Sequence, residues 1–327
     1  MNNNLNDKIL EKVRTKVAIS NFEEEERFSM SKNKILRTAA SLFLVLGITC
    51  GVAYAGYQLT NYFKIKGIDD TGIQTALQNN YVQNIDMDYI EKEEVKFKVD
   101  YLMMDDINFD LVFNFINKDA VENYEGIAVC NLKITDENNN QIYISSEDQD
   151  IWTKNIALSS EMWTTVEKQD HTLRQVVHLS SNNFPKSNKI YVSFDEVILY
   201  NVNKGNPITI KYEDDYKLEF DVSEQLSNRK SIEYTTTNSK IESAILTNSG
   251  FAITIKENNY IPRNANYIVK DAEENSFTLS NVERILKKPE LSEIEKQVMI
   301  FNITKYNESD KITLEKDGVS TIEFIKK

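Results

Sequence analysis

Cysteine and histidine are almost absent from this chain of 327 residues, with two of each. Zinc fingers, iron–sulfur sites and histidine-based catalytic sites need clusters of these side chains, so the composition argues against all three. Glycine and proline are also scarce, at 9 and 4 residues. Together with 41% hydrophobic and 27% charged residues, this excludes a wholly disordered or collagen-like chain.

Basic residues are also fewer than acidic ones. The 38 Lys and Arg residues face 51 Asp and Glu, for a net charge of −13 and a pI near 4.9. Nucleic-acid partners need clustered basic residues, so none is expected. The charge is unevenly divided, because a slightly basic N-terminal arm precedes a strongly acidic remainder.

Catalytic motifs are missing too. The chain has no G-x-S-x-G, H-E-x-x-H, P-loop or dinucleotide fingerprint. Its acids gather in runs such as Glu213-Asp214-Asp215, whereas acid–base or glycosidase chemistry needs two carboxylates held across a cleft. The sequence therefore predicts no enzyme, no cofactor and no metal.

One long apolar run stands out against a mean hydropathy of −0.46. Residues 36–57 lie in a stretch without charged side chains beyond Arg37, which is long enough for a transmembrane helix. Lys32, Lys34 and Arg37 stand at its N-terminal end, so the positive-inside rule predicts a cytoplasmic N-terminus and an extracellular C-terminal part. The expected localisation is the cell membrane, with a single pass through the lipid bilayer.

Two alternatives to a retained anchor remain open, a secretory signal cleaved after Ala55 and a buried helix of a soluble protein. Gly47, Gly51 and Ala55 have the small-xxx-small spacing that pairs membrane helices, which would give a homodimer. Small residues are also common in such helices without any pairing.

The arm, residues 1–35, carries an apolar stripe at helical spacing: Leu5, Ile9, Val13 and Val17. So short an amphipathic helix is marginal alone in water. We expect the stripe to dock on a partner protein or on the lipid surface, although a frayed and idle helix is a third option.

The remaining chain is predicted to be mainly β. A helical linker over 58–92 should lead into a first β-sandwich over 93–225 and a second, Ig-like β-sandwich over 226–327. The clearest element is a hairpin of alternating residues on either side of Met104-Asp105-Asp106. Ser280 to Glu283 has capping-box spacing, which predicts one helical turn through Leu286. Further strands are expected at 127–134, 141–144, 173–179, 190–199, 217–222, 232–234, 240–246, 251–256, 267–270, 297–303, 311–316 and 319–325.

Several polar residues invite a metal or ligand interpretation. Asp136, Asn138, Asn140 and Glu147 match calcium-loop positions, but Gln141 stands where the loop needs glycine, so an Asx-rich turn is favoured. His171 and His178 would lie on opposite faces of a strand. Cys130 has no disulfide partner outside the apolar run, and Trp152 and Trp163 are interpreted as core or edge aromatics.

Stretches across residues 30–222 resemble a known group of proteins. They are KNKILRTAA (32–40), GIQTALQNNYVQNIDMDYI (72–90), VKFKVDYLMMDDINFDLVFNF (95–115), DQDIWTKNIAL (148–158), LRQVVHLSSNNFPKSNKIYV (173–192) and VILYNVNKGNP (197–207). The group comprises single-pass membrane proteins of low-GC Gram-positive bacteria that carry a domain of unknown function and are often labelled anti-sigma factors. An Ig-like C-terminal domain commonly follows.

The resemblance implies a sigma factor as the partner of the arm. The leading expectation is therefore a membrane-anchored regulator that senses the cell envelope through its external domains. The alternative is a cell-surface structural or interaction module without regulatory output.

Overall fold

The computed structural model describes residues 71–92, 95–116, 126–145, 154–167, 172–200, 208–288, 293–307 and 309–327. All of them fall within one compact unit, Val52–Lys327. This part of the chain is mainly β, as predicted, with helices α3 (Thr71–Gln78) and α6 (Glu224–Ser227) and the 3-10 turn η2 (Lys305–Asn307).

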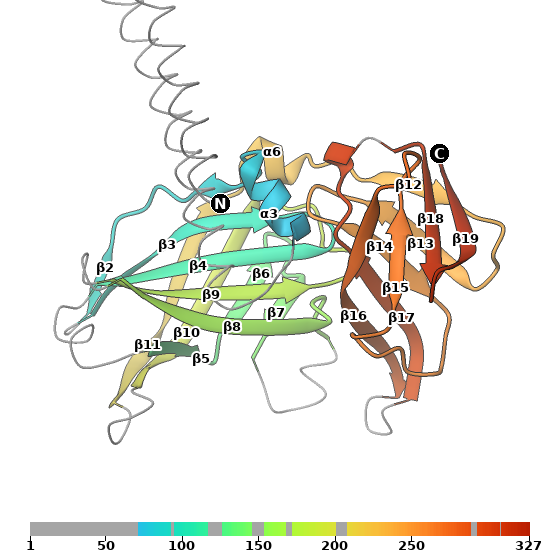
Figure 1. The fold of residues 1–327 in the computed structure, drawn as a ribbon. Helices are drawn as coiled ribbons and strands as arrows, with labels where there is room; N and C mark the ends of the chain where they lie inside the picture. The colour runs from blue at the N-terminus through green and yellow to red at the C-terminus, as the bar shows by residue number, and fades with distance from the viewer. Residues whose placement is uncertain are drawn as a thin grey trace, which may run out of the picture. The chain divides into compact units, whose positions relative to one another are not determined.

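The first β domain consists of two antiparallel sheets (Figure 1). Sheet A has the order β1-β3-β4-β9-β8, with β2 also paired to β3. Sheet B has the order β11-β10-β6-β7, with β5 also paired to β10. The strands of sheet A are β1 (Gln83–Asn84), β2 (Ile90–Lys92), β3 (Val95–Met104), β4 (Asn108–Ile116), β8 (Ser159–Glu167) and β9 (Thr172–Ser180); those of sheet B are β5 (Gly126–Cys130), β6 (Lys133–Asp136), β7 (Gln141–Ile144), β10 (Lys189–Tyr200) and β11 (Ile208–Asp221).

Aromatic rings fill the space between these sheets. The ring of Phe97, on β3, lies 5.2 Å from that of Phe194 and 4.8 Å from that of Tyr216, both on sheet B. Alternate residues of β4 point into the same core, as the period of two in the sequence requires. One continuous core therefore extends from α3 to Leu226.

The second β domain corrects the predicted fold class. Its strands close on themselves in the order β12-β13-β14-β17-β16-β15-β18-β19, so the prediction of an Ig-like sandwich is wrong and the domain is a closed barrel. A separate core extends from Tyr234 to Phe324. The strands are β12 (Ile232–Thr235), β13 (Ile241–Leu246), β14 (Phe251–Ile255), β15 (Tyr267–Lys270), β16 (Ser276–Lys288), β17 (Glu293–Phe301), β18 (Lys311–Lys316) and β19 (Val319–Lys326).

Strand β16 is the physical reason for this difference. The capping-box spacing predicted a helical turn here, yet the segment pairs with β17 on one side and with β15 on the other. Strand β12 likewise pairs with both β13 and β19. These two strands join what would otherwise be two facing sheets, and the closed sheet has no free edge.

The predicted membrane topology is also corrected. Within the described ranges, the structure contains no helix with the length and apolar character needed to cross a bilayer. The segment predicted to do so, residues 36–57, lies outside those ranges. The single-pass, extracellular arrangement predicted from the sequence is therefore not supported.

Candidate functional site at the junction of the two β domains

Two hairpin tips, one from each domain, interlock at a buried carboxylate. Asp105, in the β3–β4 turn, uses Oδ1 to accept the backbone N–H groups of Ile107 and Asn108 at 2.9 and 3.0 Å. Its Oδ2 accepts the backbone N–H and the hydroxyl of Ser249, in the β13–β14 turn, at 2.9 and 2.7 Å. Asn108 Nδ2 donates to the same hydroxyl at 2.7 Å. One carboxylate thus shapes its own turn and holds the opposite one.

An apolar contact accompanies this polar one. Ile107 is fully buried and packs with Ala252, Val298 and Ile300 of the barrel. A Cβ added to Gly250 would lie 3.0 Å from Ile107 Cδ1 and 3.0 Å from a backbone oxygen. Glycine at this position therefore avoids two tight contacts, one with the opposite tip and one with the backbone of the barrel itself.

Arg229 fastens the linker between the domains. Its Nε donates to Asp106 at 2.7 Å, and its other nitrogens donate to the carbonyls of Leu226, Phe184 and Pro185 at 2.7 to 3.1 Å. The guanidinium is buried but each of its nitrogens is hydrogen-bonded, which is the condition under which a buried charge is tolerated.

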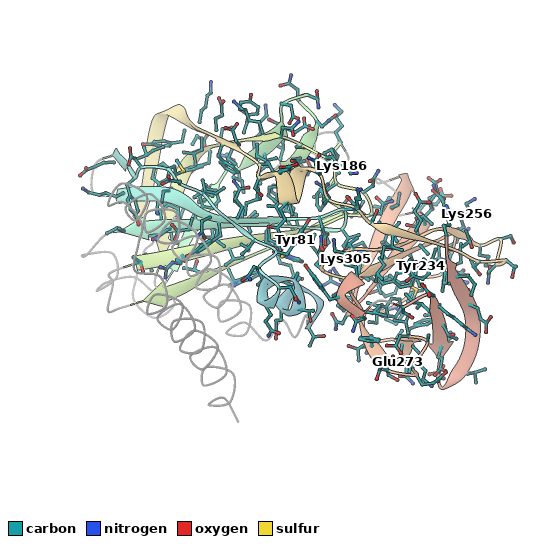
Figure 2. The ribbon with its side chains drawn as sticks, turned by 90° about the horizontal axis from the view of Figure 1, so that it is seen from above. Tyr81, Lys186, Tyr234, Lys256, Glu273 and Lys305 are labelled. Atoms are coloured by element: carbon teal, nitrogen blue, oxygen red, sulfur yellow. The ribbon has the colours of Figure 1, made fainter. Side chains whose placement is uncertain are left out.

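A third contact joins the N-terminal helical segment to the barrel. Tyr81, which follows α3, lies beside Lys305 of η2, with Nζ 6.0 Å from the ring centroid (Figure 2). The Tyr81 hydroxyl donates to the carbonyl of Met104 at 2.9 Å. Burial lowers the pKa of Lys305, whereas Asp105 and Asp106 raise it.

A second polar cluster, which we call the junction network, lies farther along the interface. On adjacent strands of sheet A, His178 Nδ1 lies 2.7 Å from Asp110 Oδ1, and His178 Nε2 lies 3.2 Å from Ser180 Oγ. Asp110 Oδ2 is buried without a hydrogen-bond partner in the described part of the chain. Burial raises the pKa of Asp110, and the adjacent His178 opposes the rise. The network comprises Asp110, Ser159, Glu161, His178, Ser180, Arg263 and Glu283.

Glu283 is the barrel's contribution to the network. Ser159, on β8, donates its hydroxyl hydrogen to Glu283 Oε1 at 2.6 Å, and Asn281 Nδ2 donates to the same oxygen. Arg263 lies 3.5 Å from Glu283 and donates to Glu161, on β8, at 3.2 Å. Burial raises the pKa of Glu283, although Ser159, Arg263, Asn281 and His178 lower it.

The order Ser180–His178–Asp110 is that of a serine-hydrolase triad. A nucleophile must meet a substrate carbonyl beside a set of oxyanion donors. Ser180, at the end of strand β9, is only 1% exposed, so a substrate carbonyl cannot reach its hydroxyl. The geometry supports a buried hydrogen-bond chain rather than an acylation site.

The surface loop that contains Arg263 also exposes an aromatic side chain. Residues 256–266 connect β14 to β15, and buried Gln297 bonds the loop at Ile261 N, Glu257 O and Asn259 O, at 2.8 to 2.9 Å. Tyr260 at its tip is 58% exposed, with the Arg284 guanidinium 5.5 Å from the ring centroid. We call residues 256–266 the tyrosine loop.

The structure does not test the site residues predicted from the sequence. Those of the arm and of the apolar run lie outside the described residues, as do Trp152, His171 and Glu147. Trp163 is buried in the first core, as predicted. The predicted docking and helix-packing residues that lie outside the described ranges are Leu5, Ile9, Val13, Val17, Gly47, Gly51 and Ala55.

The predicted Asx turn is confirmed. Asp136 accepts the backbone N–H groups of Asn138 and Asn140 at 2.9 and 2.8 Å and the side-chain amide of Asn140 at 2.6 Å. Across the described ranges, no group of three or more His, Cys, Asp or Glu is placed to hold a metal ion.

Sequence reasoning misses the junction residues for identifiable reasons. Local patterns place Glu283 in a helical capping box and Asp105 in an ordinary hairpin turn, so neither stands out as an interdomain contact. The spacing of His178 and Ser180 places them on one face of a strand, which is a signal for their proximity. Asp110 shows no comparable signal, because its partner lies 68 residues away.

Comparison with known proteins adds little to this picture. No family model matches the chain, and no curated protein matches it. The chain is similar to a structure described as the crystal structure of the conserved domain protein from Bacillus anthracis, at 10% identity and a TM-score of 0.43. That match covers 72% of this chain and 76% of the other. None of these comparisons supports the role in transcription regulation that the resemblance implies.

Proposed function

We propose that the described part of the chain is a non-catalytic interaction module, which presents its two β domains to a partner as one rigid unit. The observation that carries the proposal is the tyrosine loop. An aromatic ring that is 58% exposed stands on a loop held by three hydrogen bonds from a buried glutamine.

The chemistry of the loop suits protein recognition. Tyrosine and arginine are among the residues most enriched at the centres of protein interfaces, and here Arg284 lies beside the Tyr260 ring while Arg263 belongs to the same loop. A loop already fixed before binding loses little conformational entropy on binding. The bond from Arg263 to Glu161 makes the first domain part of the same surface.

The proposal leaves the role of the arm as a prediction. Leu5, Ile9, Val13 and Val17 would supply a second docking element, which is tested by comparing partner capture by the full chain and by a chain lacking residues 1–30. A partner retained equally by both chains would contradict docking through the arm.

Photo-crosslinking tests the tyrosine loop directly. A photoreactive phenylalanine replaces Tyr260 in the full chain within its producing cells, and a matched variant carries it at Tyr191, a 37% exposed residue of β10. We expect a discrete protein adduct from position 260 and none from position 191, and weakening of the adduct by Gln297→Ala. No adduct at 260, or equal adducts at both positions, would overturn the proposal.

A further inference from the structure

We propose that the junction network is a pH-responsive latch, in which ionisation of Glu283 loosens the contact between the barrel and the first β domain. The inference does not rest on the tyrosine loop as a binding surface. It rests on the position of a buried carboxyl between two domains that form a single compact unit.

The latch bond is the one from Ser159 to Glu283, because it crosses the interface from β8 to β16 at 2.6 Å. Glu283 is 4% exposed, so its carboxylate can regain water only when the barrel moves away from β8. Protonated Glu283 still accepts the Ser159 hydroxyl hydrogen and needs no counter-charge. Ionised Glu283 has to be balanced within the interface.

The charges around it give incomplete balance. From β8, Glu161 adds a negative charge. From β9, His178 supplies a positive charge only when its imidazole is protonated, and that imidazole is already paired with Asp110 on β4. From the tyrosine loop, Arg263 supplies one positive charge shared between Glu161 and Glu283. The charge of ionised Glu283 is thus balanced only by a guanidinium shared with Glu161 and by a histidine paired with Asp110.

Arg263 compensates Glu283 weakly. Its side chain is 51% exposed and lies 3.5 Å from Glu283, so solvent screens the attraction. Asp110 and His178 belong to one sheet and stay paired whether or not the barrel is docked. The group whose environment changes when the domains separate is therefore Glu283.

The direction of the pH effect follows from the burial. The docked state holds the Glu283 proton more tightly than the open state, where the carboxyl has an ordinary pKa near 4.5. The latch is strongest below that value and weakens as the pH rises through the raised pKa. Each unit of difference between the two pKa values weakens docking about tenfold.

Hydrogen exchange of the full chain measures the latch. Protection factors of segments 158–161 and 281–285, corrected for intrinsic rates, are compared between about pH 5 and about pH 8. We expect protection to fall with rising pH in the wild type and in the control Glu233→Gln, which alters an exposed carboxylate of the same barrel. In Glu283→Gln, we expect protection to stay constant.

A second variant, Ser159→Ala, tests the same proposal if Glu283→Gln does not fold. Ser159→Ala removes a hydrogen bond that favours the ionised carboxyl, so the fall in protection should extend to higher pH. Wild-type protection independent of pH, a pH dependence unchanged by Glu283→Gln, or a Ser159→Ala curve superimposed on the wild type would each overturn the proposal.

Discussion

Aspartate and asparagine side chains stabilise two tight turns where glycine would often stand, in a chain with only 9 glycines. Asp136 and Asp271 build two loops of one design. In each, Oδ1 accepts two backbone N–H groups and Oδ2 accepts an asparagine side chain, Asn140 or Asn275. The residue before that asparagine has a positive φ, 59° and 65° respectively. The carboxylate thus supports a conformation that glycine would otherwise provide.

A substitution in the second loop tests this role. Asp271→Ala should lower the free energy of unfolding by about 1–3 kcal/mol, because two backbone donors lose their acceptor. The control, Glu273→Ala, removes an exposed side chain of the same loop and should change it by less than about 0.5 kcal/mol. Urea denaturation measures both, and equal losses would contradict the interpretation.

Elements with a clear period of two are predictable from the sequence. The hairpin around Asp105 forms as expected, as β3 and β4, and β7 spans 141–144 as expected. Elements set by long-range pairing are not. The predicted strand 127–134 is divided into β5 and β6 around Asn131, whose φ is +53°. Strand β8 escapes prediction, although it pairs along its whole length with β9.

Strand β16 shows why a local signal can fail. A capping box can stabilise a helix only where the first turn is free to form, and here Ser280 Oγ instead donates to the carbonyl of Ile300 at 3.0 Å. Pairing with two neighbouring strands outweighs a weak helical preference. The same local signal conceals Glu283, so the sequence pattern misses the candidate site and the barrel together.

The tyrosine loop offers a test at the scale of an element. Gln297→Ala removes three hydrogen bonds to the loop, and hydrogen exchange of residues 257–261 should therefore accelerate while β14 and β17 keep their protection. An exposed glutamine, Gln225→Ala, serves as the control. Unchanged exchange in the loop would show that Gln297 does not hold it.

At the scale of the whole molecule, buried carboxyls at the junction make stability depend on pH. Burial raises the pKa of Glu283, so the folded state binds a proton that the unfolded state releases at lower pH. Stability from this group is complete below its ordinary pKa and is lost as the pH rises through the raised one. Glu283→Gln should match the wild type at low pH and exceed it at higher pH, by about 1.4 kcal/mol per unit of raised pKa.

Urea denaturation at several pH values measures this difference. The exposed variant Glu233→Gln is the control, because its carboxylate pairs with Lys327 at the surface and its pKa is lowered. A difference between Glu283→Gln and the wild type that stays constant at all pH values would contradict a raised pKa for Glu283 in the folded state.

The two domains behave as one unit because the contacts between them are buried. Asp105, Ile107 and Arg229 are each at most 3% exposed. The bonds from Asp105 to Ser249 and the packing of Ile107 on the barrel exist only while the domains remain docked. The bond from Arg229 to Asp106 exists only while the linker is in place. Removing one partner of a buried polar contact leaves the other unsatisfied. Local opening of the barrel alone is therefore disfavoured, and the domains should unfold together.

Native-state hydrogen exchange in increasing urea tests this coupling most directly. In the wild type, the most protected amides of β4 and of β14 should report the same opening free energy. In Asp105→Ala, which loses both bonds to Ser249, the value for β14 should fall below that for β4. A wild-type barrel that opens at lower free energy than the first domain, unchanged by Asp105→Ala, would show that the junction does not unite them.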